Sequence, residues 1–443
     1  MYPSQHPRRT RRTLICAILA AVAALQPVRA DVFKDKFQIN ETEPGRQDHA
    51  ALAVDADGSF AVVWESEETI GGDLDAFIRI YDGDGNPLTG ELEMHDSLAG
   101  DQRRPFLDGD LDGRYVATWA TGTQFDQGIS QRVFDAATGA PLTDEIVVNV
   151  DPIPGRTAAA VAAFRSGTHQ GKWIVFWPQW VTLDVEVEFL ASVYNADGTL
   201  FAGPVRVNQA DSIAGPGLQG AESCNEGPGG ATPCLKIAPD VAVDGSGWAT
   251  FAWEHWDDNS IIRARRMNFF TSEFEDEDEV NPSGDPETYS RRPVLDWSDS
   301  GTGDGYIVFS EFPTSNVDIT LGQSYVTKYR GPTGAWATQV FQFPFAGALG
   351  IHKPYVRVKI DPTSPIEHVA VGWTQDTDDL FLRLYDPTSG EIGTMQINET
   401  TVDDRRRMDF QIIEIGGELQ LVCIWESNEF ATSSNIFGKI YRF

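Results

Sequence analysis

The chain has 443 residues, with 34 Lys and Arg against 66 Asp and Glu, a formal net charge of −32. Such acidity argues against a nucleic acid or an anionic membrane as ligand, because both would repel the average surface of the protein. With 41% hydrophobic and 11% aromatic residues, the chain has enough apolar material for a large folded core.

The segment 1–30 has the pattern of an export signal. Four arginines between positions 8 and 12 precede the apolar run "LICAILAAVAAL", and Val28 and Ala30 occupy the small-residue positions of a signal-peptidase site. We expect a periplasmic or extracellular mature chain that starts near Asp31, has no membrane span and is free or attached to the cell surface. "TRRTLI" fits a twin-arginine signal as well as a general secretory one, and both routes stay open.

The rest of the chain, 31–443, is predicted to be a single domain of seven repeats. Each repeat has a polar loop, an apolar run, a turn and a β-rich run that ends in an aromatic residue. The spacing of these aromatic residues is 55, 58, 76, 56, 64 and 52 residues. The aromatic positions are Trp64, Trp119, Trp177, Trp253, Phe309, Trp373 and Trp425.

Each repeat is expected to form four short antiparallel strands. "DADG", "DGDG", "DLDG" and "NADG" lie between apolar runs and are hairpin signals, since Asp, Asn and Gly tolerate the positive φ of tight turns. Four-stranded units that repeat around an axis are typical of a β-propeller, so the predicted fold is an all-β, seven-bladed propeller.

A long insert at 209–238 accounts for the spacing of 76 residues. It joins the third and fourth repeats, and its Gly and Pro content indicates irregular structure. Cys224 and Cys234 lie in this insert, and in an oxidising compartment we expect them to form a disulfide. Cys423 lies in the apolar run "LQLVCIW" and is expected to be a buried free thiol.

The last repeat lacks a fourth strand. The chain ends at "NIFGKIYRF" (435–443), which corresponds to a third strand, whereas "DKFQIN" (35–40) resembles the fourth strands "TMQIN" and "VRVN". We therefore expect the N-terminal strand to pair with the C-terminal blade and to close the ring.

The repeats also resemble the propeller repeats of large secreted bacterial surface proteins. The segments that carry the resemblance are "GDQRRPF", "FAVVWES", "AFIRIYDGDGNPL" and "ISQRVFDAATGAPL", and repeats four and five depart from it. The resemblance implies the propeller fold and an extracytoplasmic setting. It implies no activity, because propellers include enzymes, lectins and scaffolds.

Basic residues gather just before the first strand of each repeat. When the repeats are aligned on Ala50, Pro105, Ala159, Pro239, Pro293, Pro354 and Met408, the four preceding residues contain eleven Lys or Arg, where the average composition predicts about two. In a propeller these loops lie at one mouth of the central channel. The predicted ligand-binding residues of this basic collar are Arg46, His49, Arg103, Arg104, Arg156, Lys236, Tyr289, Arg291, Arg292, His352, Lys353, Arg405, Arg406 and Arg407.

Two interpretations of the collar stay open. Acidic residues follow the aromatic position at Glu65, Glu254, Glu311 and Glu426, so the arginines could form ion pairs that join neighbouring blades. Alternatively, a concave basic mouth could bind an anionic glycan or an acidic protein partner, since Arg binds carboxylate and sulfate through two hydrogen bonds.

A non-enzymatic recognition or scaffold role is the function that we predict. The alternative is an extracellular polysaccharide-degrading enzyme, similar to a polyuronate lyase or a glycoside hydrolase. In a lyase, His49, His352 or Tyr289 would abstract a proton beside a uronate carboxylate that the arginines neutralise.

No cofactor is expected. The run "DGDLDG" (108–113) spaces Asp108, Asp110 and Asp112 as in a calcium loop, but Trp119 stands where such a loop needs a Glu. A hairpin turn explains this run better than calcium. Motifs of serine hydrolases, nucleotide-binding loops and zinc proteases are absent from the sequence.

Overall fold

The structure is a computed structural model of the whole chain. The residues that it describes are 31–42, 45–67, 72–96, 100–123, 126–149, 159–182, 186–209, 223–224, 232–233, 239–256, 260–280, 288–298, 304–313, 323–330, 336, 341–343, 356–360, 368–375, 379–386, 390–398, 405–430 and 433–443. They contain β-strands and a single 3-10 turn, Gly167–His169. Within these ranges there is no helix long and apolar enough to cross a membrane.

Seven antiparallel sheets of four or five strands, each corresponding to one repeat, account for most of the described residues. The first three are β2 (Gln47–Val54), β3 (Phe60–Ser66), β4 (Asp75–Tyr81), β5 (Leu92–Glu93); β6 (Asp101–Gly109), β7 (Arg114–Thr123), β8 (Asp126–Asp135), β9 (Ile146–Val147); β10 (Ala160–Ala163), β11 (Trp173–Thr182), β12 (Glu186–Tyr194), β13 (Leu200–Arg206).

The next three are β16 (Asp240–Val243), β17 (Trp248–Trp256), β18 (Ser260–Asn268), β19 (Glu273–Phe274) with β20 (Asp278–Glu279); β21 (Thr288–Trp297), β22 (Asp304–Pro313), β23 (Gln323–Arg330), β24 (Phe341–Phe343); β25 (Val356–Ile360), β26 (Val369–Gln375), β27 (Asp379–Asp386), β28 (Gly390–Gln396). The last is β29 (Arg405–Ile415), β30 (Glu418–Phe430), β31 (Ser433–Arg442) and β1 (Asp31–Gln38).

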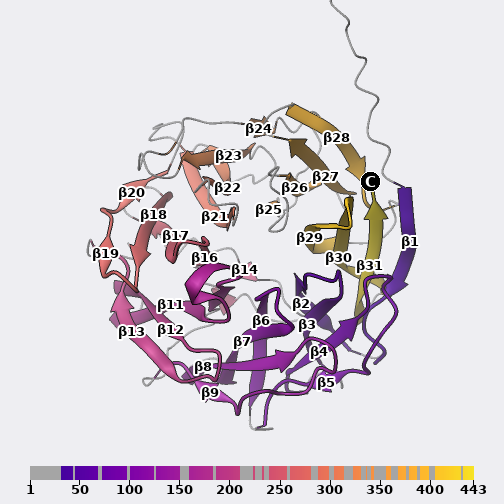
Figure 1. The fold of residues 1–443 in the computed structure, drawn as a ribbon, viewed down its shortest axis with the longest axis horizontal. Coiled ribbons are helices and arrows are strands. Elements are labelled where there is room, and N and C mark those ends of the chain that lie inside the picture. The colour runs from indigo at the N-terminus through magenta and orange to yellow at the C-terminus, as the bar shows by residue number, and fades with distance from the viewer. Residues whose placement is uncertain are drawn as a thin grey trace, which may run out of the picture.

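The sheets stand around a common centre, as in a β-propeller (Figure 1). The first strand of each unit, such as β2, β6 and β29, lies near the centre, and fourth strands such as β5 and β28 lie at the rim (Figure 1). The prediction of an all-β fold made of four-stranded antiparallel sheets is confirmed.

The aromatic residue of each repeat lies on the second strand of its sheet and is buried. The side chains of Trp64 and Trp253 are fully covered, and Trp373 is the most accessible of the seven at 6%. Burying one large side chain contributes about 1.5–3 kcal/mol, so this position in every unit is a main source of stability.

In the second, third and sixth repeats, the Asn that follows the fourth strand stabilises the start of the third strand. Its side-chain oxygen accepts a hydrogen bond from a main-chain N–H there, which explains why an apolar–Asn pair recurs in the sequence. The pairs within single repeats are Ile129 N–Asn149 Oδ1 (2.6 Å), Phe189 N–Asn208 Oδ1 (2.8 Å) and Leu380 N–Asn398 Oδ1 (2.8 Å).

The two ends of the described chain lie in one sheet. Strand β1 pairs antiparallel with β31, with Asp31 opposite Arg442 and Gln38 opposite Phe437. Asn40 Oδ1 then accepts the N–H of Ile436 at 2.8 Å, which is the contact that the second, third and sixth repeats make within themselves. Strand β1 therefore occupies the place of a fourth strand beside β31.

Inner-strand aspartates connect neighbouring sheets. In each case one carboxylate oxygen accepts a main-chain N–H from the inner strand of the following unit, so the sheets are joined near the centre as well as packed through their faces. The pairs are Asp108–Ala163 (2.8 Å), Asp240–Leu295 (2.8 Å), Asp296–Ile360 (2.8 Å) and Asp409–Leu52 (2.9 Å).

The register of the sixth sheet differs from the expected alignment. In the other units, the residue on which the repeats are aligned lies across from the aromatic residue of the second strand. In the sixth unit, β25 places Val356 opposite Trp373, so the aligned residue Pro354 is two positions too early. The sixth unit has no Pro or Ala at the matching point, and sequence similarity alone therefore favoured the wrong residue.

In the insert, a short ribbon pairs β14 (Ser223–Cys224) with β15 (Thr232–Pro233). Cys234 lies outside the described residues, and the disulfide stays a prediction. Cys423 is free and fully buried in β30, as expected from its apolar neighbours.

Candidate functional site

The inner strands carry a β-bulge at the same point in four sheets. Pairing with the second strand steps from Asp48 to Ala51, and the same step recurs in the second, fifth and seventh units. The residue before the aligned position lies within each bulge and is basic in all four. These residues are His49, Arg104, Arg292 and Arg407.

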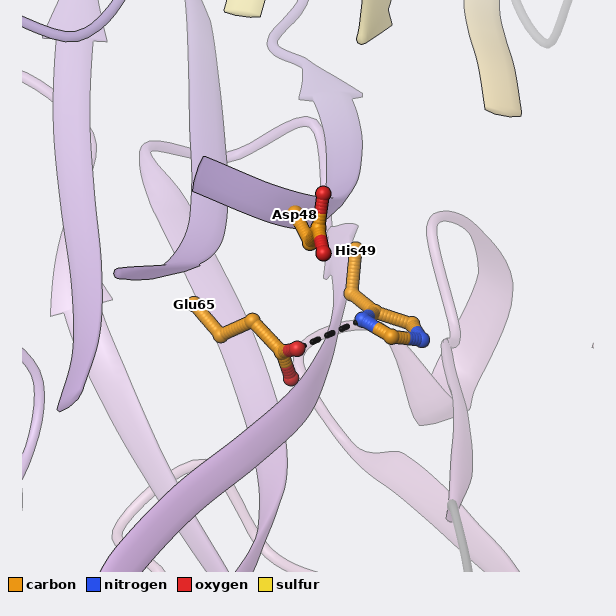
Figure 2. A group of neighbouring side chains, drawn as sticks. All are labelled: Asp48, His49 and Glu65. Carbon is orange, nitrogen blue, oxygen red and sulfur yellow. Dashed lines mark hydrogen bonds and ion pairs between the residues drawn. The ribbon is translucent and has the colours of Figure 1, made fainter. Parts of the chain in front are cut away.

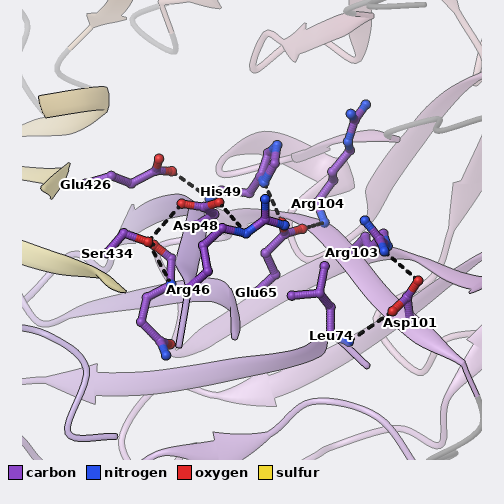
Figure 3. A network of polar contacts seen from close by, with 11 residues as sticks. Arg46, Asp48, His49, Glu65, Leu74, Asp101, Arg103, Arg104, Glu426 and Ser434 are labelled. Carbon is purple, nitrogen blue, oxygen red and sulfur yellow. Dashed lines mark hydrogen bonds and ion pairs between the residues drawn. The ribbon is translucent and has the colours of Figure 1, made fainter. Parts of the chain in front are cut away.

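This arrangement corrects one expectation. The basic residues were expected in loops, but β6, β21 and β29 begin before them, so they lie within the inner strands. A bulge inserts one extra residue and changes the direction of its side chain. The side chain of Arg104 accordingly points away from Glu65 and Asp101 in Figure 3.

Two bulge residues adopt a backbone conformation that L-residues avoid. The φ angles of His49 and Arg104 are 55° and 50°, in the left-handed region. This conformation costs about 1–2 kcal/mol in residues other than glycine, so surrounding contacts must hold it.

Glutamates of the preceding sheets stabilise this backbone conformation. The N–H of His49 donates to Glu426 Oε1 at 2.6 Å, and the N–H of Arg104 donates to Glu65 Oε2 at 2.8 Å. Sequence analysis identified these glutamates as partners of arginine side chains. Both glutamates also accept main-chain N–H groups at the bulges, a role that only the strand register reveals.

Glu65 is the centre of a polar cluster in the first unit. Its side chain is 1% exposed, and Oε1 lies 2.8 Å from His49 Nδ1 and 3.7 Å from Arg46 Nη2 (Figure 2, Figure 3). Burial alone would raise the pKa of Glu65. The charge and hydrogen bond of His49, the N–H of Arg104 and the charge of Arg46 outweigh burial and hold that pKa well below its usual range.

The other arginines of this sector pair with acids on their own strand segment. Arg46 Nε lies 2.9 Å from Asp48 Oδ2, and Arg103 Nη2 donates to Asp101 Oδ2 at 2.6 Å. Asp101 also accepts the N–H of Leu74 at 3.0 Å (Figure 3). This part of the basic collar is therefore compensated locally by acidic residues.

The glutamine of "GDQRRPF" has a structural role. Gln102 Oε1 accepts the indole N–H of Trp119 at 3.0 Å, and Gln47 does the same for Trp64 at 3.0 Å. Both glutamines are buried. This position of the repeat therefore fixes the orientation of the core tryptophan beside the bulge.

Asp48, His49 and Glu65 have the residue types of a metal site. Their ligand atoms lie within 4.8 Å of one another. However, Arg46 already supplies positive charge to both carboxylates, and His49 Nδ1 is bonded to Glu65. The contacts fit an ion-pair cluster better than a metal centre.

The aspartates of the calcium-like run bind protein groups. Asp108 contacts Arg165 at 2.5 Å and accepts the N–H of Ala163, while Asp110 pairs with Arg114 at 2.6 Å. Residues 110–113 form the turn between β6 and β7. This geometry matches the hairpin interpretation of the run.

The remaining predicted site residues divide into two groups. Tyr289, Arg291, Arg292, Arg405, Arg406 and Arg407 lie on β21 and β29, where only the backbone is described. Arg156, Lys236, His352 and Lys353 lie outside the described residues. The structure therefore brings together Arg46, His49, Arg103 and Arg104 of the predicted collar.

No family model matches the chain, and no curated protein matches its sequence. Among solved structures, a protein of unknown function from Dyadobacter fermentans is similar, with a TM-score of 0.52 and 9% identity over 94% of this chain and 99% of that one. An ulvan lyase of polysaccharide lyase family 25 has a TM-score of 0.48 and 11% identity over 92% and 95% of the two chains.

A six-bladed β-propeller lectin from Aleuria aurantia has a TM-score of 0.43 and 9% identity over 80% of this chain and 97% of its own. At these identities the likeness concerns the fold alone. The arrangement of antiparallel sheets around a common centre is in itself that of an all-β protein of the β-propeller type (Figure 1).

Proposed function

We propose that the protein is an exported seven-bladed propeller whose inner-strand bulges present basic side chains to an anionic glycan. The seven sheets correspond one to one with the seven repeats. Closure of the ring is supported by the pairing of β1 with β31 and by the hydrogen bond of Asn40 with Ile436 N. Export is supported by the pattern of segment 1–30.

The recurrent bulge is the observation that carries this function. A basic residue occupies it in four sheets, and in two it adopts an unfavourable φ that a buried glutamate stabilises. Backbone strain at non-glycine residues is typical of functional sites.

A polymeric ligand suits sites that repeat around a ring. Each of the four units with a basic bulge residue can contact one acidic group of a chain of uronate or sulfated sugars, and several weak contacts to one molecule add up to high avidity. The strongly acidic surface elsewhere leaves the basic side chains of the inner strands as the place for an anion.

A glycan array at two salt concentrations tests this function. We expect binding to uronated or sulfated glycans that weakens with salt, because partly exposed charges are screened. The variant Arg104→Asn with Arg292→Asn removes two bulge cations, and Asn tolerates the left-handed conformation. Binding should weaken by about tenfold per lost charge-assisted contact.

Arg206→Asn is the matched control. Arg206 lies on the outer strand β13 and pairs with Glu188 at 2.9 Å, so the substitution removes one cation away from the bulges and is compared with Arg104→Asn alone as well as with the double variant. If the double variant binds as well as wild type but unfolds at a lower temperature, the arginines only join the sheets and the proposed function is wrong.

A polyuronate lyase is the second candidate, and one contact favours it. His49 is oriented by a buried carboxylate through Nδ1, an arrangement suited to a general base (Figure 2). Lyase activity produces an unsaturated uronate that absorbs ultraviolet light. A rise in absorbance that His49→Asn abolishes would establish catalysis, and its absence with retained glycan binding would leave recognition as the function.

A further inference from the structure

Buried indole N–H groups differ among the repeats. The Nε1 atoms of Trp64 and Trp119 donate to glutamines, whereas those of Trp177, Trp253 and Trp425 have no hydrogen-bond partner among the described residues. All five side chains are at most 2% exposed. A buried donor without an acceptor costs about 1–3 kcal/mol, so a missing partner at three equivalent places requires an explanation.

The sequence explains part of this difference between the indoles. At the position of Gln47 and Gln102, the three units with unpaired indoles have a cation, namely Arg156, Lys236 and Arg405. Lys and Arg are donors only and cannot accept a hydrogen bond from an indole. A third group that accepts from both would satisfy the arrangement.

The seventh unit shows the geometry best. Arg405 on β29 lies directly opposite Ser427 on β30, as Gln47 lies opposite Ser66 in the first unit. Residues directly opposite in an antiparallel pair share a face, and so do residues two apart on a strand. Arg405, Ser427 and Trp425 therefore lie on one face of this sheet.

Ser427 adds a second donor. Its side chain is fully buried, and Oγ has no hydrogen-bond partner within the described part of the chain. One face of the sheet thus combines two buried donors, Trp425 Nε1 and Ser427 Oγ, with the arginine position. The indole can only donate, and the serine hydroxyl, which donates as well as accepts, can turn its proton toward an anion. Ser66 Oγ of the first unit is also unpaired among the described residues, so it is the unpaired indole beside a cation that distinguishes the seventh unit.

We propose that the seventh unit holds a small-anion site in which Trp425 Nε1–H and Ser427 Oγ–H bind a halide or one carboxylate or sulfate oxygen, on the sheet face where the register places the cation Arg405. This inference deepens the proposed function, since an acidic sugar would supply such an oxygen, but a free inorganic anion has the same chemistry. The equivalent positions of the third and fourth units follow the same rule in sequence.

Thermal unfolding of the full chain in sodium bromide tests the site. An anion that binds only the folded protein at ten times its Kd raises the ratio of folded to unfolded molecules about elevenfold. We expect a saturable rise in Tm for wild type. Arg405→Gln restores the glutamine of the first two units, so it should raise Tm without bromide and reduce the bromide response.

Gln102→Arg is the reciprocal control. It replaces the acceptor of the Trp119 indole N–H by a cation, so it should lower Tm in the absence of bromide and create a rise in Tm when bromide is added. Ser427→Ala removes one donor and should weaken the response of the seventh unit. These comparisons separate a site from general screening of an acidic protein, because Gln102→Arg and Arg405→Gln change the net charge in opposite directions.

Anomalous diffraction from crystals with bromide locates the ion. A peak beside Trp425 Nε1 and Ser427 Oγ is the expected result. The absence of an anomalous peak there in crystals with bromide, or an Arg405→Gln variant that melts lower and responds as wild type does, would overturn the site. Repeating the titration with sodium glucuronate separates a sugar acid from a free halide as the natural source.

The outcome also distinguishes this site from the proposed function. A bromide response without glycan binding keeps the anion site and removes the glycan function. Glycan binding that depends on Arg104, without any effect of bromide on Tm, keeps the glycan function and removes the anion site.

Discussion

Replacing Glu65 by Gln tests the cluster that holds the bulges. The substitution keeps the size of the side chain but removes the charge that faces His49 and Arg46. One oxygen of Glu65 contacts His49 Nδ1 and the other accepts the N–H of Arg104. The amide of Gln would place an NH₂ group at one of these two positions.

The magnitude follows from burial. Glu65 is 1% exposed, so its lost hydrogen bond to a charged partner and the uncompensated cations should cost about 2–4 kcal/mol. The 413 residues from 31 to 443 unfold with an entropy of about 0.9 kcal/mol per kelvin if they form one cooperative unit. We therefore expect Tm to fall by about 2–4 °C.

Differential scanning calorimetry and urea unfolding measure this change. Glu93→Gln on the exposed strand β5 is the control, since it removes the same charge at the surface and should change stability by less than about 0.5 kcal/mol. Equal Tm values for Glu65→Gln and Glu93→Gln would refute the role of Glu65 at the bulges.

Three further predictions follow from contacts of single residues. Acidification below about pH 4.3 should destabilise wild type more than Glu65→Gln. The pKa of Glu65 is lower in the folded than in the unfolded protein, so the stability that its charge contributes is lost as the pH falls toward the folded-state pKa. Unfolding curves at several pH values measure the difference, and equal losses of stability in the two proteins would contradict it. Asn40→Ala should cost about 1–3 kcal/mol by leaving the N–H of Ile436 unpaired, and limited proteolysis should then release an N-terminal fragment that Asn149→Ala does not release. Burial raises the pKa of the Cys423 thiol, so iodoacetamide should modify Cys423 only in denaturant, which mass spectrometry of peptides determines; fast labelling of native protein would contradict its burial.

Much of the fold could be predicted from the sequence because its signals are local. Aromatic spacing, Asp-Gly turns and the apolar–Asn endings each depend on a few adjacent residues. The place of the N-terminal strand could also be predicted, since "DKFQIN" resembles the fourth strands and the seventh repeat lacks one.

The site was less predictable because it depends on pairing register. The bulges at His49 and Arg104 arise from how two strands align, and the sequence does not specify whether a residue belongs to a loop or to a bulged strand. Once the strands are known, the ion pair of Arg103 with Asp101 follows directly, because residues two apart on a strand share a face.

The anion site was hidden for a related reason. The cations that replace glutamine were counted with the collar, and only the unpaired indoles of the structure separate them from the bulge residues.

A crystal structure with a uronate or sulfated oligosaccharide tests the central claim most directly. We predict that acidic groups of the sugar lie within hydrogen-bond distance of the bulge side chains, including Arg104, around the inner strands. A sugar bound only at the rim, with its acidic groups away from every bulge, would contradict the account.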